Sequence, residues 1–137
     1  MRKAASPARA ERHLGRVRGI CLALPGASER LSHGEPTFFT GKRVFAMFSN
    51  NHHGDGRLAV IVPAELGMQD LLIDRHPRRY FYPAYVGSAG WVGVELSRVG
   101  DAELARVIRA AWRLVAPKRA VKAWNDGPRG RASGTRG

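Results

Sequence analysis

Helical spacing of apolar residues is concentrated near the two ends of this sequence, and that division most constrains the fold. Near the start, apolar residues recur at intervals of three and four: Leu14, Val17, Cys21 and Leu24. This spacing predicts an amphipathic helix over residues 7–24, which Pro25-Gly26 ends. A stronger pattern begins at Asp101 and predicts a last helix that reaches Pro117. Its expected buried side consists of Leu104, Val107, Ile108, Ala111, Leu114 and Val115.

Between these helices, short runs of aromatic and branched side chains lie among glycines and prolines, a pattern typical of strands. The runs are residues 37–39, 43–48, 58–62 and 91–96. Gly41-Lys42 predicts a tight hairpin, and the turn formers of residues 49–57 predict a longer, exposed hairpin loop. A shorter helix is expected between Pro63 and Pro77. The sequence therefore predicts an α+β fold in the order α-β-β-β-α-β-α, with a mostly antiparallel sheet and flanking helices.

The length of 137 residues, with 44% hydrophobic content, suits one core of ordinary size. We expect a single domain over residues 7–124, because Val121 and Trp124 can dock a final short segment. Residues 1–6 are expected to be a disordered basic arm. Residues 125–137 are expected to be a disordered Gly/Arg-rich tail, since they offer no apolar anchor against the entropy of ordering.

The net charge of +12 is divided unevenly along the chain. Residues 1–18 carry six Arg or Lys against one acidic residue, and residues 118–137 again carry six against one. Residues 19–117 hold eleven basic side chains against nine acidic ones. Basic ends attract a polyanion in a salt-dependent way that ignores sequence. Whether residues 19–117 recognise a nucleic acid has to be argued from particular side chains.

Several function classes are excluded or disfavoured. Cys21 is the only cysteine, so no intrachain disulfide forms, and residues 58–64, the longest apolar stretch, are too short to span a bilayer. The histidines lack HExxH or CxxC spacing, and the chain has no GxSxG elbow and no nucleotide-binding glycine loop. We therefore expect a cytoplasmic protein without a metal site, a cofactor or catalytic residues, and a monomer is favoured.

A set of short motifs occurs in a specific order. It comprises Leu24-Pro25-Gly26, His33-Gly34-Glu35-Pro36-Thr37-Phe38, Gly41-Lys42-Arg43-Val44-Phe45-Ala46, Tyr82-Pro83-Ala84-Tyr85, Trp91, and the run from Ala111 to Arg119. In this order the chain resembles the MmcQ/YjbR family, described as predicted DNA-binding proteins with a double-wing motif. The resemblance implies a compact α+β fold, hairpin wings that contact DNA, and no catalytic residues. The chain departs from the family where many members have His-x-x-Lys-x-x-Trp, because here only Trp91 is kept and the lysine is absent.

The leading hypothesis is a nucleic-acid-binding module of low sequence specificity, with DNA a more suitable partner than RNA. The two hairpin wings would bring Lys42, Arg43 and Arg57 to phosphates. Arg78 and Arg79 precede the aromatic run 80–82, and cations beside aromatics are the two parts of a single-strand platform. The list of candidate residues is completed by Lys118 and Arg119.

The alternative is a non-catalytic domain that binds a protein or a small ligand, such as an acidic peptide or a metabolite. Its candidate cleft lies near His33, Tyr85 and Trp91. A concave, aromatic-lined pocket would favour this alternative. An enzyme comes third, and a buried His33 bonded to a carboxylate inside a pocket would support it.

Overall fold

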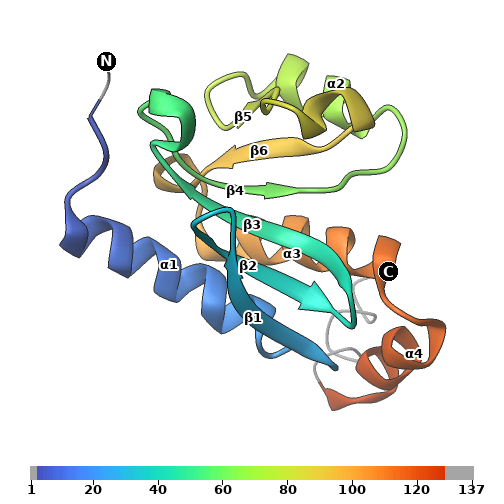
Figure 1. The fold of residues 1–137 in the computed structure, drawn as a ribbon. Coiled ribbons are helices and arrows are strands. Elements are labelled where there is room, and N and C mark those ends of the chain that lie inside the picture. The colour runs from blue at the N-terminus through green and yellow to red at the C-terminus, as the bar shows by residue number, and fades with distance from the viewer. Residues whose placement is uncertain (1–2, 129–137) are drawn as a thin grey trace.

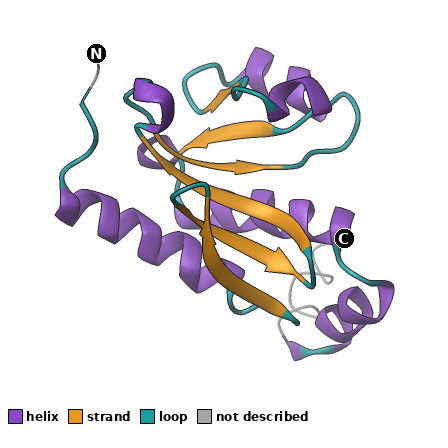
Figure 2. Ribbon diagram, in the orientation of Figure 1, coloured by secondary structure: helices purple, strands orange, loops and turns teal. Residues whose placement is uncertain are grey.

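The structure, a computed structural model, describes residues 3–128. Six antiparallel strands form one sheet, and helices α1 and α3 pack on one of its faces (Figure 1; Figure 2). The helices are α1 (Pro7–Cys21), α2 (Met68–Arg75), α3 (Asp101–Val115) and α4 (Lys118–Asp126), with short 3-10 helices η1 (His52–Gly54), η2 (Val86–Ala89) and η3 (Leu96–Arg98). The strands are β1 (Ala27–Ser32), β2 (Glu35–Thr40), β3 (Arg43–Asn50), β4 (Leu58–Val62), β5 (Tyr80–Phe81) and β6 (Val92–Glu95), in spatial order β1-β2-β3-β4-β6-β5. The predicted α+β class with an antiparallel sheet is confirmed.

The strand register separates the two faces of the sheet. Across β3, β4, β6 and β5, one row of partners is buried: Phe48, Val60, Val94 and Tyr80. This row joins Leu104 and Ile108 of α3 in the core. The adjacent row consists of Met47, Ile61, Gly93 and Phe81. Because successive side chains of a strand point to opposite faces, this second row lies on the face away from α3. We call it the open face.

One arginine of α1 fixes this helix to η3 and to the start of α3. The guanidinium of Arg16 donates to the backbone oxygens of Leu96 and Val99, both at 2.7 Å, and to Asp101 Oδ1, also at 2.7 Å. These bonds join α1 to η3 and to the first turn of α3. The donors of Arg16 are therefore used inside the protein.

Strand β1 is absent from the sequence prediction. It pairs with β2 from Ala27 opposite Thr40 to Ser32 opposite Glu35. As an edge strand it is polar and largely exposed, so it lacks the apolar run that predicts a strand. Its Glu29 accepts two hydrogen bonds of 2.8 Å from Arg18 of α1, which fixes the edge to the body.

The C-terminal part of the domain is organised by two tryptophans. Trp112 of α3 is fully buried, and Trp124 of α4 is 5% exposed, with ring centroids 6.4 Å apart in a T-shaped arrangement. Trp124 thus packs α4 against α3. Leu114 was expected on the buried side of α3 but is 41% exposed, since the helical repeat places it at the margin of the stripe that contains Leu104 and Ile108.

The predicted terminal segments are partly ordered. In the arm, Ala5 N donates to Asn50 Oδ1 at 3.0 Å and Ser6 caps α1 through Arg9 N. In the tail, residues 125 and 126 belong to α4, and residues 129–137 lie outside the described part. Over residues 3–128, no helix combines the length and the apolar content needed to cross a bilayer.

Candidate functional sites

The turn between β2 and β3 carries two of the seven basic residues predicted to bind nucleic acid. Gly41 adopts a φ of 62°, a left-handed conformation that suits glycine and closes the turn. Lys42 and Arg43 follow it with exposed side chains. Neither forms an ion pair or side-chain hydrogen bond within residues 3–128.

Two more predicted residues, Lys118 and Arg119, open helix α4. Both are exposed and, in the described part of the chain, neither has a carboxylate partner. Helix α4 and the β2–β3 turn lie toward the same end of the molecule, at the lower right of Figure 1. We call Lys42, Arg43, Lys118 and Arg119 the basic end.

Arg57 lies at the other end of β3. The hairpin loop before it follows Asn50, where β3 finishes, whereas the turn at Gly41 precedes its start. Arg57 forms a short ion pair with Glu95, and its Cζ atom lies 4.0 Å from the centre of the Phe81 ring. The two predicted wings therefore point to opposite ends of the sheet, and the charge of Arg57 is compensated.

The sequence around Arg78 and Arg79 does not present a free aromatic row. Tyr80 is buried and its hydroxyl donates to Glu103, the residue that also pairs with Arg79 at 3.2 Å. Burial and this hydrogen bond raise the pKa of Tyr80. Phe81 packs on the open face, and only the Tyr82 ring is well exposed, at 60%. Arg78 is exposed without a partner in residues 3–128.

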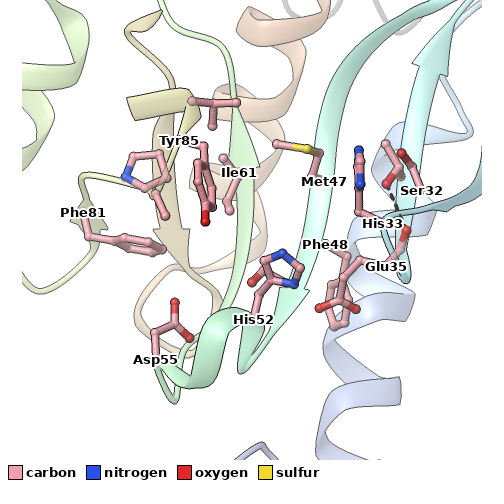
Figure 3. Close-up of a pocket in the computed structure, with 15 residues that line it drawn as sticks. Ser32, His33, Glu35, Met47, Phe48, His52, Asp55, Ile61, Phe81 and Tyr85 are labelled. Carbon is pink, nitrogen blue, oxygen red and sulfur yellow. Dashed lines mark hydrogen bonds between the residues drawn. The ribbon is translucent and has the colours of Figure 1, made fainter. Parts of the chain in front are cut away.

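A pocket of about 430 Å³ opens on the open face of the sheet, at the end of β3 that leads into η1. We call it the open-face pocket. Phe81 and Tyr85 line one side of it and Met47 and His33 line the other, with Ile61 between them (Figure 3). Pro83, Ala84 and Val86 extend the apolar wall.

Polar groups gather at the rim of the open-face pocket. Glu35, His52 and Asp55 come from β2 and from the loop after β3 (Figure 3). Glu35 Oε2 accepts from Asn50 N at 2.9 Å, and Asp55 Oδ1 accepts from Arg57 N at 2.9 Å. Both carboxylates are thus held by the backbone of the hairpin loop.

Left-handed backbone marks the same region. In residues 3–128, the non-glycine residues with positive φ are His33, Asn51 and Tyr85. His33 and Tyr85 line the pocket, and Asn51 begins the loop that carries His52. Tyr85 is the centre of a tight turn closed by a 2.7 Å bond from Val86 N to Ala84 O. Such conformations cost energy and cluster where a protein binds or reacts.

Two of the three residues predicted for a ligand cleft line the pocket, namely His33 and Tyr85, and Trp91 does not. The backbone oxygen of Trp91 accepts from Gln69 Nε2 at 2.6 Å, and the same amide donates to Gly87 O at 2.8 Å. These bonds tie η2, which carries part of the pocket wall, to α2. His33 is exposed, so it lacks the buried carboxylate bond expected of a catalytic histidine.

Sequence reasoning missed Glu35, Met47, His52 and Asp55 as neighbours in one site. Glu35 stands in the motif that enters β2, and His52 and Asp55 belong to the turn formers of residues 49–57, which indicate only a loop. Within residues 3–128, no group of three His, Cys, Asp or Glu side chains could hold a metal ion. Only the register of β2, β3 and β4 brings these residues around one pocket.

The comparisons with known proteins agree with this architecture. The YjbR family model matches residues 22–114, more than half of the chain. The fold is similar to the crystal structure of protein DR2400 from Deinococcus radiodurans, which carries the family-model domain DUF419. That similarity has a TM-score of 0.63 at 22% identity and covers 82% of this chain and 84% of that one, so it bears on the fold alone. No curated protein matches the sequence. On the match of the family model, this chain belongs to the YjbR family.

Proposed function

We propose that this protein is a small, non-catalytic nucleic-acid-binding module that prefers DNA and has low sequence specificity. Its contact surface is the basic end, formed by Lys42, Arg43, Lys118 and Arg119. It acts as a monomer in the cytoplasm. The observation that carries the proposal is that four exposed cations without acidic partners in residues 3–128 occupy two segments at one end of the molecule.

The acidic residues of β1, the strand beside β2, and of α4 are already engaged. Glu29 binds Arg18, and Asp126 accepts from Lys122 at 2.6 Å. The basic end therefore keeps a positive potential that phosphates can meet. Beyond residue 128 the sequence adds Arg129, Arg131 and Arg136 and no acidic residue, which strengthens nonspecific attraction.

This proposal modifies the double-wing picture. One wing, the turn at Gly41, contributes to the contact, and helix α4 takes the place of the second. Arg57 and Arg79 are left out because Glu95 and Glu103 pair with them. Contacts to phosphates alone position a duplex without reading its bases, so low specificity follows.

The test is the affinity for a short DNA duplex, measured over a series of salt concentrations. The variant Lys42→Gln/Arg43→Gln/Lys118→Gln/Arg119→Gln should reduce the magnitude of the slope of log affinity against log salt by about 3.6, since each of the four lost phosphate contacts removes roughly 0.9. Single-stranded DNA and an RNA duplex of the same sequence measure the preference for DNA.

The matched control removes four exposed cations elsewhere, as Arg12→Gln/Arg75→Gln/Arg78→Gln/Arg98→Gln. It has the same net charge and should retain most of the wild-type slope. Equal losses in the two variants would mean that net charge alone drives binding. A third variant, Arg129→Gln/Arg131→Gln/Arg136→Gln, isolates the tail, and a complete loss of binding there would assign the contact to the tail.

A further inference from the structure

The open-face pocket is separate from the proposed DNA contact. Its volume of about 430 Å³ lies within the range of roughly 300–1,000 Å³ that small-molecule sites occupy. It is lined by the η1 end of β3, by β2 and β4, and by the segment from Phe81 to Val86. The basic end lies beyond the opposite end of β3.

The charge of the pocket is opposite to that of the protein. Within residues 3–128, no Lys or Arg is among the residues that line this pocket. Two carboxylates, Glu35 and Asp55, do line it. In a protein of net charge +12, a pocket with this lining selects against anions such as phosphates and acidic metabolites.

Glu35 is positioned to receive a cation. Its Oε2 atom accepts from Asn50 N at 2.9 Å, which fixes the side chain and leaves the other oxygen for a ligand. Within residues 3–128, no Lys, Arg or His pairs with this carboxylate. The negative charge is therefore not neutralised by the protein itself.

Arg57, which contacts the Phe81 wall of the pocket, is itself paired. Arg57 is bonded to Glu95, and its guanidinium covers one face of the Phe81 ring at 4.0 Å. Its charge is thereby compensated by Glu95. A ligand cation at Glu35 then meets no Lys or Arg in the described lining.

The rest of the lining suits an apolar body. Met47 and Ile61 form the floor on the sheet, and Tyr85, which is 80% exposed, presents its ring from the opposite wall (Figure 3). Aromatic faces attract ammonium groups as well as apolar groups. His33 and Tyr85, both on the rim of the pocket, have left-handed backbone conformations that cost energy.

We infer that the open-face pocket binds a small organic cation, an amine with an aromatic or aliphatic body. Its ammonium group lies at Glu35, with Asp55 adding to the field, and its body lies over Met47 and Ile61 against Tyr85. This inference is independent of the proposed DNA contact, since the residues of the two sites do not overlap.

Three probes that share an indole body separate charge from shape. Tryptamine is a cation, N-acetyltryptamine is neutral and indole-3-propionate is an anion. Titration of the full chain, followed by calorimetry and by NMR shifts of the amides of Met47 and Ile61, should show tryptamine binding about ten-fold more tightly than N-acetyltryptamine. Indole-3-propionate should bind most weakly.

Glu35→Gln tests the role assigned to the carboxylate, since the amide oxygen can still accept from Asn50 N. It should weaken the binding of tryptamine about ten-fold and leave the affinity for N-acetyltryptamine unchanged. Glu65→Gln, the same change at an exposed carboxylate outside the pocket, should alter neither affinity. Met47→Lys places a cation on the half-exposed floor and should reverse the order, so that indole-3-propionate binds best.

Three results would overturn the inference. They are equal affinities for the three probes, absence of saturable binding by tryptamine, and tryptamine binding that neither Glu35→Gln nor Met47→Lys changes. None of these results bears on the salt dependence of DNA binding.

Discussion

The ring of Phe81 lies on Gly93, so close that a Cβ atom at this glycine would be 2.2 Å from Phe81 Cζ. The two residues are partners in the β5–β6 pair, and the ring fills the space that a side chain at position 93 would take. The guanidinium of Arg57 also contacts this ring. Gly93 therefore determines where one wall of the open-face pocket stands.

Gly93→Ala should destabilise the protein by about 1–3 kcal/mol, because the methyl group forces the Phe81 ring away from the sheet. Urea denaturation measures this change. Gly19→Ala, on the exposed side of α1 with open space around it, should instead stabilise by about 0.5–1 kcal/mol. Unchanged stability of the Gly93 variant would contradict the close contact.

Arg16→Lys should destabilise the protein by about 2 kcal/mol. A lysine has no planar fork, so it cannot reach Leu96 O, Val99 O and Asp101 together, and backbone acceptors lose their partner. Arg12→Lys, one turn earlier and exposed, should remain within about 0.5 kcal/mol of wild type. Comparison of the two unfolding midpoints decides whether Arg16 joins α1 to η3.

His13 should make stability depend on pH. Burial, followed by the nearby Arg16, Arg12 and Arg9, lowers the pKa of His13 below its ordinary value of 6.5. The unfolded state therefore takes up the proton first, so the free energy of unfolding is fully retained above pH 6.5 and falls as the pH drops below it. In unfolding curves over this range, His13→Gln should flatten the dependence, whereas His76→Gln, at an exposed site, should preserve it.

Trp124→Ala should release α4 from the body. The side chain packs against Trp112 and lies under Arg109, whose Cζ is 5.2 Å from the ring centre. Its truncation should lower the free energy of unfolding by about 3–5 kcal/mol if α4 unfolds together with the domain. The loss should be smaller if α4 alone detaches. In a Trp91→Phe background, where Trp112 is the remaining tryptophan of the Trp124→Ala variant, its fluorescence reports the detachment. Trp124→Phe should retain most of the packing, and an unchanged Trp112 signal in Trp124→Ala would argue against this contact.

The sequence alone was sufficient for the elements with strong periodicity. Leu14, Val17 and Cys21 lie in the core on one side of α1, as their spacing predicts, and the runs that contain Phe45 and Val60 form central strands. Their burial could be predicted because apolar residues recur at the period of a helix or form a short apolar run in a strand. Strand β1 carries no such repeat, because a polar edge strand is held by backbone pairing and by the Arg18–Glu29 contact.

The open-face pocket could be predicted only in part. The turn chemistry around His33 and Tyr85 signals unusual backbone, and both residues reach the pocket. Glu35 and Asp55 line one pocket only through the pairing of β2, β3 and β4. That register is a tertiary property, and a list of residues in chain order does not contain it.

Strand β3 spans eight residues between the turn at Lys42 and the corner at Asn51, which corresponds to about 26 Å of extended backbone. An occupant at one end of this rod does not obstruct the other end. The two proposed sites can therefore be occupied at the same time in one copy of the molecule, with β3 as the spacer between them.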